Sequence, residues 1–147
     1  MYIIFRHSHS FIAALALAFI IFAIVYNIFS WMKKKPFSKT NKIANLLGMA
    51  GAHIQLIFGL ILYFISPLGF SNFSGEAMKN SLFRLHIIEH PLTMLIAVVL
   101  ITIGYSKAKN ITDDIQKYKK IVLFYLIGLI LILIRIPWHS WMIIPNF

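Results

Sequence analysis

Apolar residues dominate four stretches of the chain, and each stretch is about as long as a helix that crosses a bilayer. About 20 helical residues cross a hydrocarbon core of ~30 Å. The stretches lie at 11–32, 43–66, 81–105 and 121–136, the last followed by an aromatic tail. The pattern therefore predicts an all-α fold, an integral membrane four-helix transmembrane bundle, with helices at about 9–32, 42–66, 80–106 and 117–141.

Composition supports a membrane protein. The chain has 147 residues, of which 60% are hydrophobic and 12% charged, and its mean hydropathy is +0.82. Four spanning helices leave little chain for anything else. We therefore expect a single transmembrane domain over residues 1–147 and no separate soluble domain.

The net charge of +10 is concentrated in the connections between the predicted spans. Short cytoplasmic loops of membrane proteins are enriched in lysine and arginine. This predicts that both connections are cytoplasmic, that both termini are non-cytoplasmic, and that the charge faces the lipid bilayer and no nucleic acid. Ten of the fourteen basic residues are the lysines of these connections: Lys33, Lys34, Lys35, Lys39, Lys42, Lys107, Lys109, Lys117, Lys119 and Lys120.

The residue types that are missing exclude several chemistries. The chain has no cysteine, which excludes disulfides, iron–sulfur clusters and c-type haem attachment. It has four acidic residues, one of them inside a predicted span, so no carboxylate pair is available for acid–base work. The composition favours an electron carrier or accessory subunit over a stand-alone enzyme.

The third span opens with the sequence LFRLHIIEHPLTM, which places ionisable side chains among lipid-compatible residues. On a helix, His86 and His90 are one turn apart on one face, and Met94 extends that row. Pro91 lacks an N–H, so we expect a kink at this point. Ionisable residues in a membrane-spanning helix are functional-site candidates because they are costly to insert. This stretch is the main candidate site.

A histidine of the second span lies at a similar depth. His53 is about 20 Å from the outer end of its span, and His90 about 15 Å from the outer start of its own, at 1.5 Å per residue. Side chains that differ by ~5 Å in depth can converge on one ligand. His9, at the outer mouth of the first span, is a further candidate ligand.

Haem is the cofactor that this arrangement favours, since imidazoles ligate its iron and an apolar bundle suits the macrocycle. We expect b-type haem (heme b) with His53 and His90 as the metal ligands. Arg84 and Arg135 are placed to meet its propionates, together with Arg6 and Lys79. Glu89 is expected to orient a ligand histidine or to pair with Arg135.

Two other interpretations remain open at this point. A copper site is an alternative, because His86, His90 and Met94 form a His/His/Met row on one helix face. The polar residues are also compatible with a purely structural cluster of hydrogen bonds that holds the four helices together.

Four segments together resemble a family of short four-span bacterial membrane proteins labelled cytochrome b. They are HSHS, GAHIQLIFGLILYFISP, IIEHPLTMLIAVVLITIGYSK and IPW. Two positions depart from the family: FIAA stands where the family has Gly-Leu-Arg-Trp, and His139 stands where the family has proline. His139 is therefore not carried over as a ligand. The positions that match are His9, His53, Glu89, His90, Pro91 and Trp138.

The resemblance implies a cytochrome-b-like protein of the bacterial inner membrane that binds haem between the second and third helices. It implies a role in respiratory electron transfer, with quinone or a respiratory complex as partner. An accessory subunit or assembly factor of a larger respiratory complex is the alternative.

Overall fold

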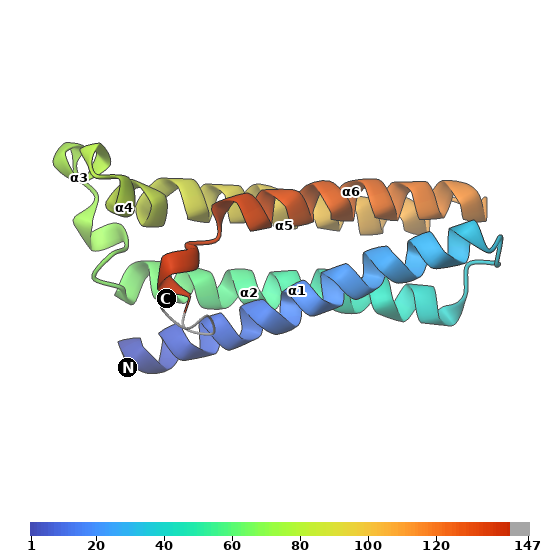
Figure 1. Cartoon of the computed structure of the whole chain (residues 1–147), viewed down its shortest axis with the longest axis horizontal. Coiled ribbons are helices and arrows are strands. Elements are labelled where there is room, and N and C mark those ends of the chain that lie inside the picture. The colour runs from blue at the N-terminus through green and yellow to red at the C-terminus, as the bar shows by residue number, and fades with distance from the viewer. Residues whose placement is uncertain (142–147) are drawn as a thin grey trace.

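The computed structural model describes residues 1–141, and within that part of the chain every regular element is helical (Figure 1). The long helices are α1 (Tyr2–Met32), α2 (Lys39–Ile65), α5 (His90–Lys109) and α6 (Asp114–Arg135). The short elements are η1 (Phe70–Asn72), α3 (Gly75–Lys79), α4 (Ser81–Arg84), the π-helical turn η2 (Leu85–Glu89) and η3 (Trp138–Ser140). Because α4, η2 and α5 follow one another without a break, they form one rod, Ser81–Lys109.

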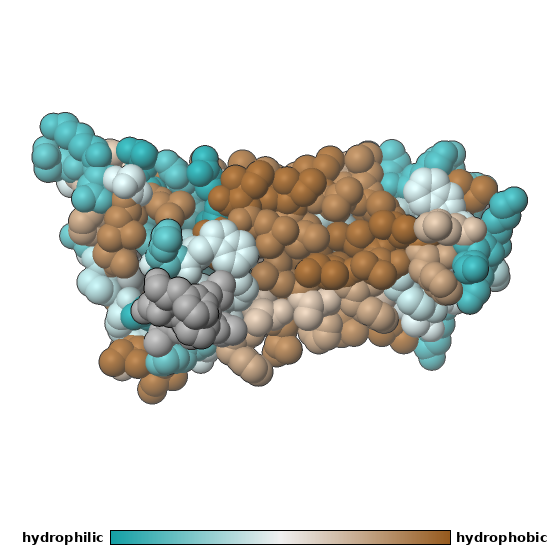
Figure 2. All heavy atoms as spheres, in the orientation of Figure 1, coloured by the Kyte–Doolittle hydropathy of each residue, from teal (hydrophilic) through white to brown (hydrophobic). Residues whose placement is uncertain are grey.

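Within residues 1–141, three helices are long and apolar enough to cross a membrane: Tyr2–Met32, Lys39–Ile65 and Ser81–Lys109. On the face drawn in Figure 2, apolar residues cover the middle of the molecule and polar residues gather toward its two ends. The uncharged part of helix α6 is shorter than that of these three helices. Its uncharged run covers residues 121–134, about 21 Å at 1.5 Å per residue, between lysines at its start and Arg135 at its end.

The prediction of four helices is wrong by one, because the outer connection forms the additional helix α3. The Ser74 side chain caps it by accepting a hydrogen bond from the Ala77 N–H. Glu76 lies in its first turn and Lys79 in its last, which suits the helix dipole, and the two side chains pair at 3.1 Å. A strong local cap thus makes a helix that hydropathy does not show.

The predicted helix bounds also need correction at several ends. Helix α1 begins at Tyr2, seven residues before the expected residue 9, since no glycine or proline interrupts that segment. Helix α2 begins at Lys39, because Ser38 and Asn41 form a capping box. Helix α6 begins at Asp114, capped by Asp113, and ends at Arg135 instead of residue 141. Pro137 favours an extended residue before it, and Ile136 adopts that conformation with ψ 130°.

The long helices pack as two hairpins, α1 with α2 and α5 with α6 (Figure 1). Glycines permit the close approach within each hairpin. A Cβ on Gly51 of α2 would lie 3.3 Å from Cα of Ala16 in α1, so the two helices are in close contact there. A Cβ on Gly104 of α5 would lie 2.5 Å from Cβ of Phe124 in α6.

The lysine end of the bundle, where residues 33–38 and 110–113 connect the helices, contains a buried polar network. Asn27 of α1 donates to Oδ1 of Asn45 in α2 at 2.6 Å. Tyr125 of α6 donates from its hydroxyl to the Asn45 carbonyl, also at 2.6 Å. Asn41 of α2 donates to Asn27 and to Ser30 at 3.3 Å each. These bonds tie α1, α2 and α6 together at this end.

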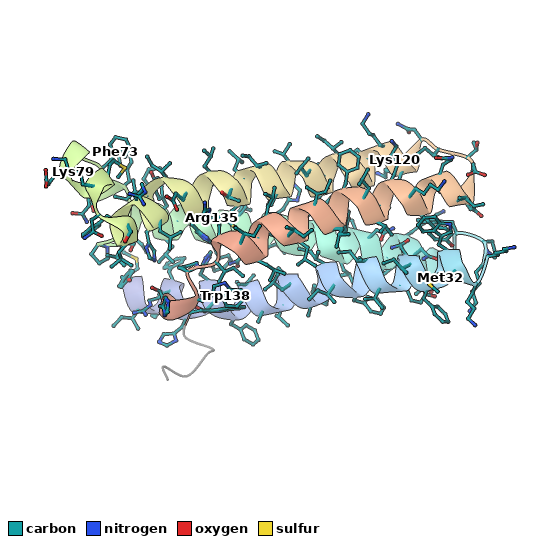
Figure 3. The ribbon with its side chains drawn as sticks, turned by 45° about the horizontal axis from the view of Figure 1, so that its top comes forward. Met32, Phe73, Lys79, Lys120, Arg135 and Trp138 are labelled. Atoms are coloured by element: carbon teal, nitrogen blue, oxygen red, sulfur yellow. The ribbon has the colours of Figure 1, made fainter. Side chains whose placement is uncertain are left out.

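The opposite end, the histidine end, holds the start of α1, helices α3 and α4, and η3 (Figures 1 and 3). Trp141 donates from Nε1 to the carbonyl of Ser10 in α1 at 3.2 Å. The chain after α6 therefore turns across the bundle and contacts α1. This crossing replaces the straight helical continuation that the apolar pattern predicts.

Candidate functional site

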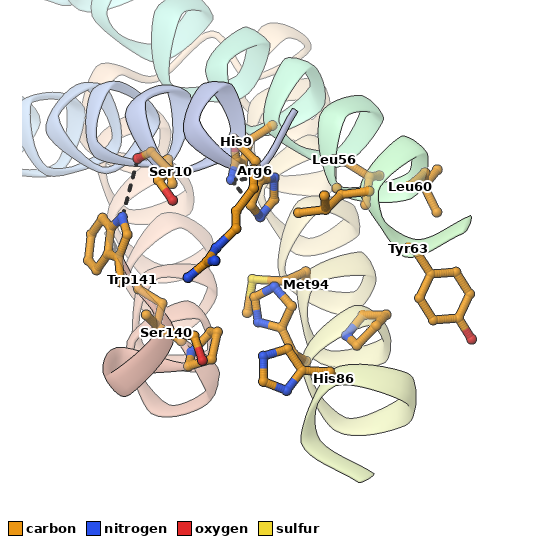
Figure 4. A pocket seen from close by; sticks show the side chains of 18 of the residues that line it. Arg6, His9, Ser10, Leu56, Leu60, Tyr63, His86, Met94, Ser140 and Trp141 are labelled. Atoms are coloured by element: carbon orange, nitrogen blue, oxygen red, sulfur yellow. Dashed lines mark hydrogen bonds between the residues drawn. The ribbon is translucent and has the colours of Figure 1, made fainter. Parts of the chain in front are cut away.

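A cavity of about 270 Å³ lies between the two hairpins at the histidine end (Figure 4). Small-molecule sites commonly measure about 300–1,000 Å³, so the volume of this cavity is just below that range. Its lining is mostly apolar, and all four long helices contribute to it. The polar or sulfur-bearing side chains that contribute to the lining include Arg6, His9, Gln55, His86, His90 and Met94.

His90 is held by the end of the neighbouring helix. Its Nδ1 lies 2.8 Å from the backbone carbonyl of Arg135, the last residue of α6. Carbonyls in the last turn of a helix have no intrahelical donor. A carbonyl accepts and cannot donate, so the neutral His90 ring carries its proton on Nδ1. Its Nε2 then keeps a lone pair, which is the form in which imidazole ligates a metal.

His86 is held in the same way within its own rod. Its Nδ1 lies 2.9 Å from the carbonyl of Leu82, so Nε2 again keeps the lone pair. His86 belongs to the π-helical turn η2, which ends directly before His90 and Pro91. The distortion that Pro91 predicts is thus realised as a π turn, an element that is frequent at functional sites.

His9 faces His90 from the other hairpin. The two ring centroids are 6.4 Å apart and the ring planes are nearly perpendicular, at 82°. The amide nitrogen of Gln55 in α2 lies 3.1 Å and 3.2 Å from the two ring nitrogens of His9. Gln55 therefore holds His9 on the α1–α2 side of the cavity, while Arg135 holds His90 on the α5–α6 side. The Oε1 atom of Gln55 is buried without a hydrogen-bond partner among the described residues.

Glu89 joins two arginines beside the cavity. Its carboxylate lies 2.8 Å from Nε of Arg84 and 3.6 Å from Nη1 of Arg135. Of the two roles expected for Glu89, the structure shows the pairing with Arg135, and Arg84 is a second, unpredicted partner. Arg84 also donates to the carbonyl of Met78. Neither arginine lines the cavity, whereas Arg6 does, pointing into it in Figure 4.

His53 lies elsewhere. It lines a separate groove between α2 and α5, together with Thr102 and apolar residues, and it does not line the cavity of His90. The structure therefore does not bring the two predicted metal ligands, His53 and His90, together. The reason is rotational: Gln55, two residues after His53, points at His9, and two helical residues turn the face by about 200°.

The separation of two imidazoles in the cavity matches the spacing of a haem ligand pair. Metal–imidazole bonds are about 2.0–2.1 Å long, so two imidazoles on opposite sides of one metal ion have ring centroids about 6 Å apart. His9 and His90 show that separation. Arg6 supplies a cation for an anionic substituent, and within residues 1–141 it forms no ion pair of its own. Those residues contain no group of three or more His, Cys, Asp or Glu side chains placed to hold a metal ion.

Comparisons with known proteins add no relative. No family model, curated protein or solved structure matches the chain. What the cavity does must be inferred from its own residues.

The sequence reasoning missed the contributions of Gln55 and Trp141 to the cavity. Gln55 has the pattern of a residue that packs between helices. The residue it contacts is His9, a candidate ligand. Arg6 was among the four cations expected near the propionates, and it is the one of the four that lines the cavity, although it lies outside the predicted first helix. Trp141 belongs to an aromatic tail that resembles an interfacial belt. His139, which was not assigned as a ligand, is exposed and does not line the cavity.

Proposed function

We propose that the protein is a membrane electron carrier of cytochrome-b type, with haem b in the cavity at the histidine end. His9 and His90 are the axial ligands in this proposal. The observation that carries it is their placement: two imidazoles from different hairpins face each other at 6.4 Å across a largely apolar cavity. His9 replaces His53 as the partner of His90.

The environment of each imidazole supports this role. The Arg135 carbonyl fixes the His90 tautomer, as a backbone acceptor often does for a ligand histidine. The amide nitrogen of Gln55 contacts the ring of His9, and Arg6, which lines the cavity, would supply a cation for a propionate. Haem with two histidine ligands has both axial positions filled, which favours electron transfer over oxygen chemistry.

The proposal includes four membrane spans. Helix α6 crosses with its flanking lysines and Arg135 extending to the two interfaces, as long basic side chains do. The lysine end is then cytoplasmic and the histidine end faces outward, in a bacterial inner membrane. The haem lies in the outer half of the bilayer.

The test is a visible absorption spectrum of the purified protein before and after reduction with dithionite, together with its haem and metal content. One haem per chain with sharp reduced Soret and α bands supports the proposal. A colourless protein with neither haem nor metal contradicts it and favours an accessory subunit or assembly factor of a respiratory complex.

Copper is the second candidate, and one observation favours it. His86, His90 and Met94 all line the cavity, and Figure 4 shows His86 and Met94 on the same side of it. Imidazole and thioether ligands suit Cu(I). Stoichiometric copper without haem in the purified protein decides for this alternative.

A further inference from the structure

The side-chain amide of Gln55 uses only one of its two ends in the cavity at the histidine end. Its nitrogen lies 3.1 Å from Nδ1 and 3.2 Å from Nε2 of His9. Its oxygen, Oε1, is buried and has no hydrogen-bond partner in the part of the chain that the structure describes. A buried acceptor without a donor is costly, so this oxygen needs an explanation.

The nitrogen end of Gln55 does not suit a ligand role for His9. A neutral imidazole has one N–H and one lone pair, and an amide nitrogen can only donate. If it donates to Nδ1 of His9, the imidazole proton is on Nε2, which then has no lone pair for a metal. If it donates to Nε2, it occupies the lone pair that a metal needs.

The other histidines of the predicted spans show the opposite arrangement. In each of them Nδ1 lies 2.8–2.9 Å from a backbone carbonyl oxygen, so Nδ1 donates and Nε2 keeps its lone pair. The pairs are His53 with Met49, His86 with Leu82, and His90 with Arg135. At His9 the neighbour of the ring nitrogens is the Gln55 side chain, so an oxygen in its place would give His9 the same tautomer.

We infer that Gln55 is a positioning residue that presents Oε1 to the Nδ1–H group of His9. A half-turn about its Cγ–Cδ bond exchanges the oxygen and nitrogen, which are nearly the same in shape. The oxygen then occupies the place of the nitrogen, 3.1 Å from Nδ1, which is within hydrogen-bond distance. The buried oxygen gains a donor, and the lone pair of His9 stays on Nε2, the ring nitrogen farther from the α1 backbone.

This hydrogen bond would orient the ring and raise its basicity, as the partners of metal-bound histidines do. Removing such a partner typically lowers metal affinity by about 10–100-fold. The hydrogen bond itself needs no cofactor. Its meaning as support for an axial ligand rests on the proposed function.

The first experiment determines which nitrogen of His9 carries the proton. Solid-state NMR of the imidazole nitrogens is recorded on the full-length, dithionite-reduced protein in lipid bilayers, at alkaline pH, where imidazole is neutral. The His9 signals are assigned through their correlation with the backbone. We expect the proton on Nδ1 in the wild type and a mixture of tautomers in Gln55→Met, which removes the amide at similar length. A wild-type proton on Nε2 overturns the inference.

The second experiment asks whether Gln55 acts as acceptor or donor. The rate of haem transfer to excess apomyoglobin is compared in Gln55→Met, Gln55→Glu and the exposed control Gln116→Met. We expect about tenfold faster loss in Gln55→Met, and a rate near that of the wild type in Gln55→Glu, whose carboxylate only accepts. Gln116→Met should match the wild type. Loss from Gln55→Glu as fast as from Gln55→Met, with normal helicity in both, overturns the inference; if either variant does not fold, the wild-type NMR spectrum decides.

The two proposals fail separately. If the purified protein carries no haem but His9 has its proton on Nδ1 and loses that preference in Gln55→Met, the proposed function fails and the positioning role of Gln55 stands. If haem is bound through His9 and His90 but Gln55→Met changes neither the tautomer nor the rate of haem loss, only the inference about Gln55 fails.

Discussion

His90 donates a hydrogen bond from Nδ1 to the backbone carbonyl of Arg135, 2.8 Å away, so the last turn of α6 determines which nitrogen of His90 faces the cavity. The side chain of the same Arg135 pairs with Glu89, the residue that precedes His90. The end of one helix and the bend of its neighbour thus stabilise each other. Disturbing the ion pair should therefore affect both stability and the environment of His90.

Glu89→Gln should lower the melting temperature in detergent more than Arg135→Gln. Removing the carboxylate leaves both Arg84 and Arg135 without their ion-pair partner. Removing Arg135 leaves Glu89 paired with Arg84 at 2.8 Å. The double variant should lose less than the sum of the single losses, because the two groups interact. The matched control is Glu76→Gln, whose exposed pair with Lys79 should contribute almost nothing. Strictly additive losses would mean that Glu89 and Arg135 act independently.

Gly104→Ala should destabilise the α5–α6 hairpin by about 1–3 kcal/mol, the usual cost of overpacking a well-packed core. The new Cβ would lie 2.5 Å from Cβ of Phe124, so one helix must shift. Gly75→Ala is the control, since nothing lies within 4 Å of a Cβ at that position. Thermal unfolding of the three proteins in one detergent compares them. Equal melting temperatures for both variants would refute the close packing of this hairpin.

Tyr125→Phe should destabilise the lysine end by about 1 kcal/mol, because it removes a buried hydrogen bond to the Asn45 carbonyl. Tyr26→Phe serves as the control, because the Tyr26 hydroxyl makes no side-chain hydrogen bond within residues 1–141 and the ring is only half-buried. Chemical unfolding followed by circular dichroism measures both. If Tyr26→Phe were the more damaging change, the network around Asn45 would not be the element that fastens this end.

The membrane topology can be tested by labelling single introduced cysteines. The chain has no native cysteine, so it gives no background labelling. Single substitutions Lys33→Cys and Asn110→Cys place a thiol on each lysine-end connection, and Ser71→Cys places one in the outer connection. A membrane-impermeant maleimide added to intact cells should label only Ser71→Cys. Labelling at either lysine-end position would reverse or break the predicted topology.

The helices of the fold were predictable from the sequence, but the faces they present were only partly so. Hydropathy locates the long helices. It also gives the approximate depth of each polar residue in the membrane, because the rise per helical residue is constant. It does not give the rotation of one helix against another. Gln55 and His53 illustrate this: both lie at the same depth, yet one reaches His9 and the other faces Thr102 across a different groove.

Local backbone chemistry accounts for most of what was missed. A single proline predicts a distortion near His90, but it does not predict that the distortion takes the form of a π turn over Leu85–Glu89. The turn after Arg135 follows from Pro137, a signal that the apolar pattern of the aromatic tail obscured. Arg6 enters the cavity only because α1 continues to Tyr2.

In the function that we propose, one histidine from each hairpin ligates a haem at the histidine end. The most direct measurement is the dithionite-reduced absorption spectrum of purified His9→Ala and His90→Ala beside the exposed-site controls His7→Ala and His139→Ala. We expect both cavity variants to lose the haem or its low-spin α band, and both controls to keep the wild-type spectrum. A wild-type spectrum in His9→Ala, or a wild-type protein that contains no haem, would contradict the account.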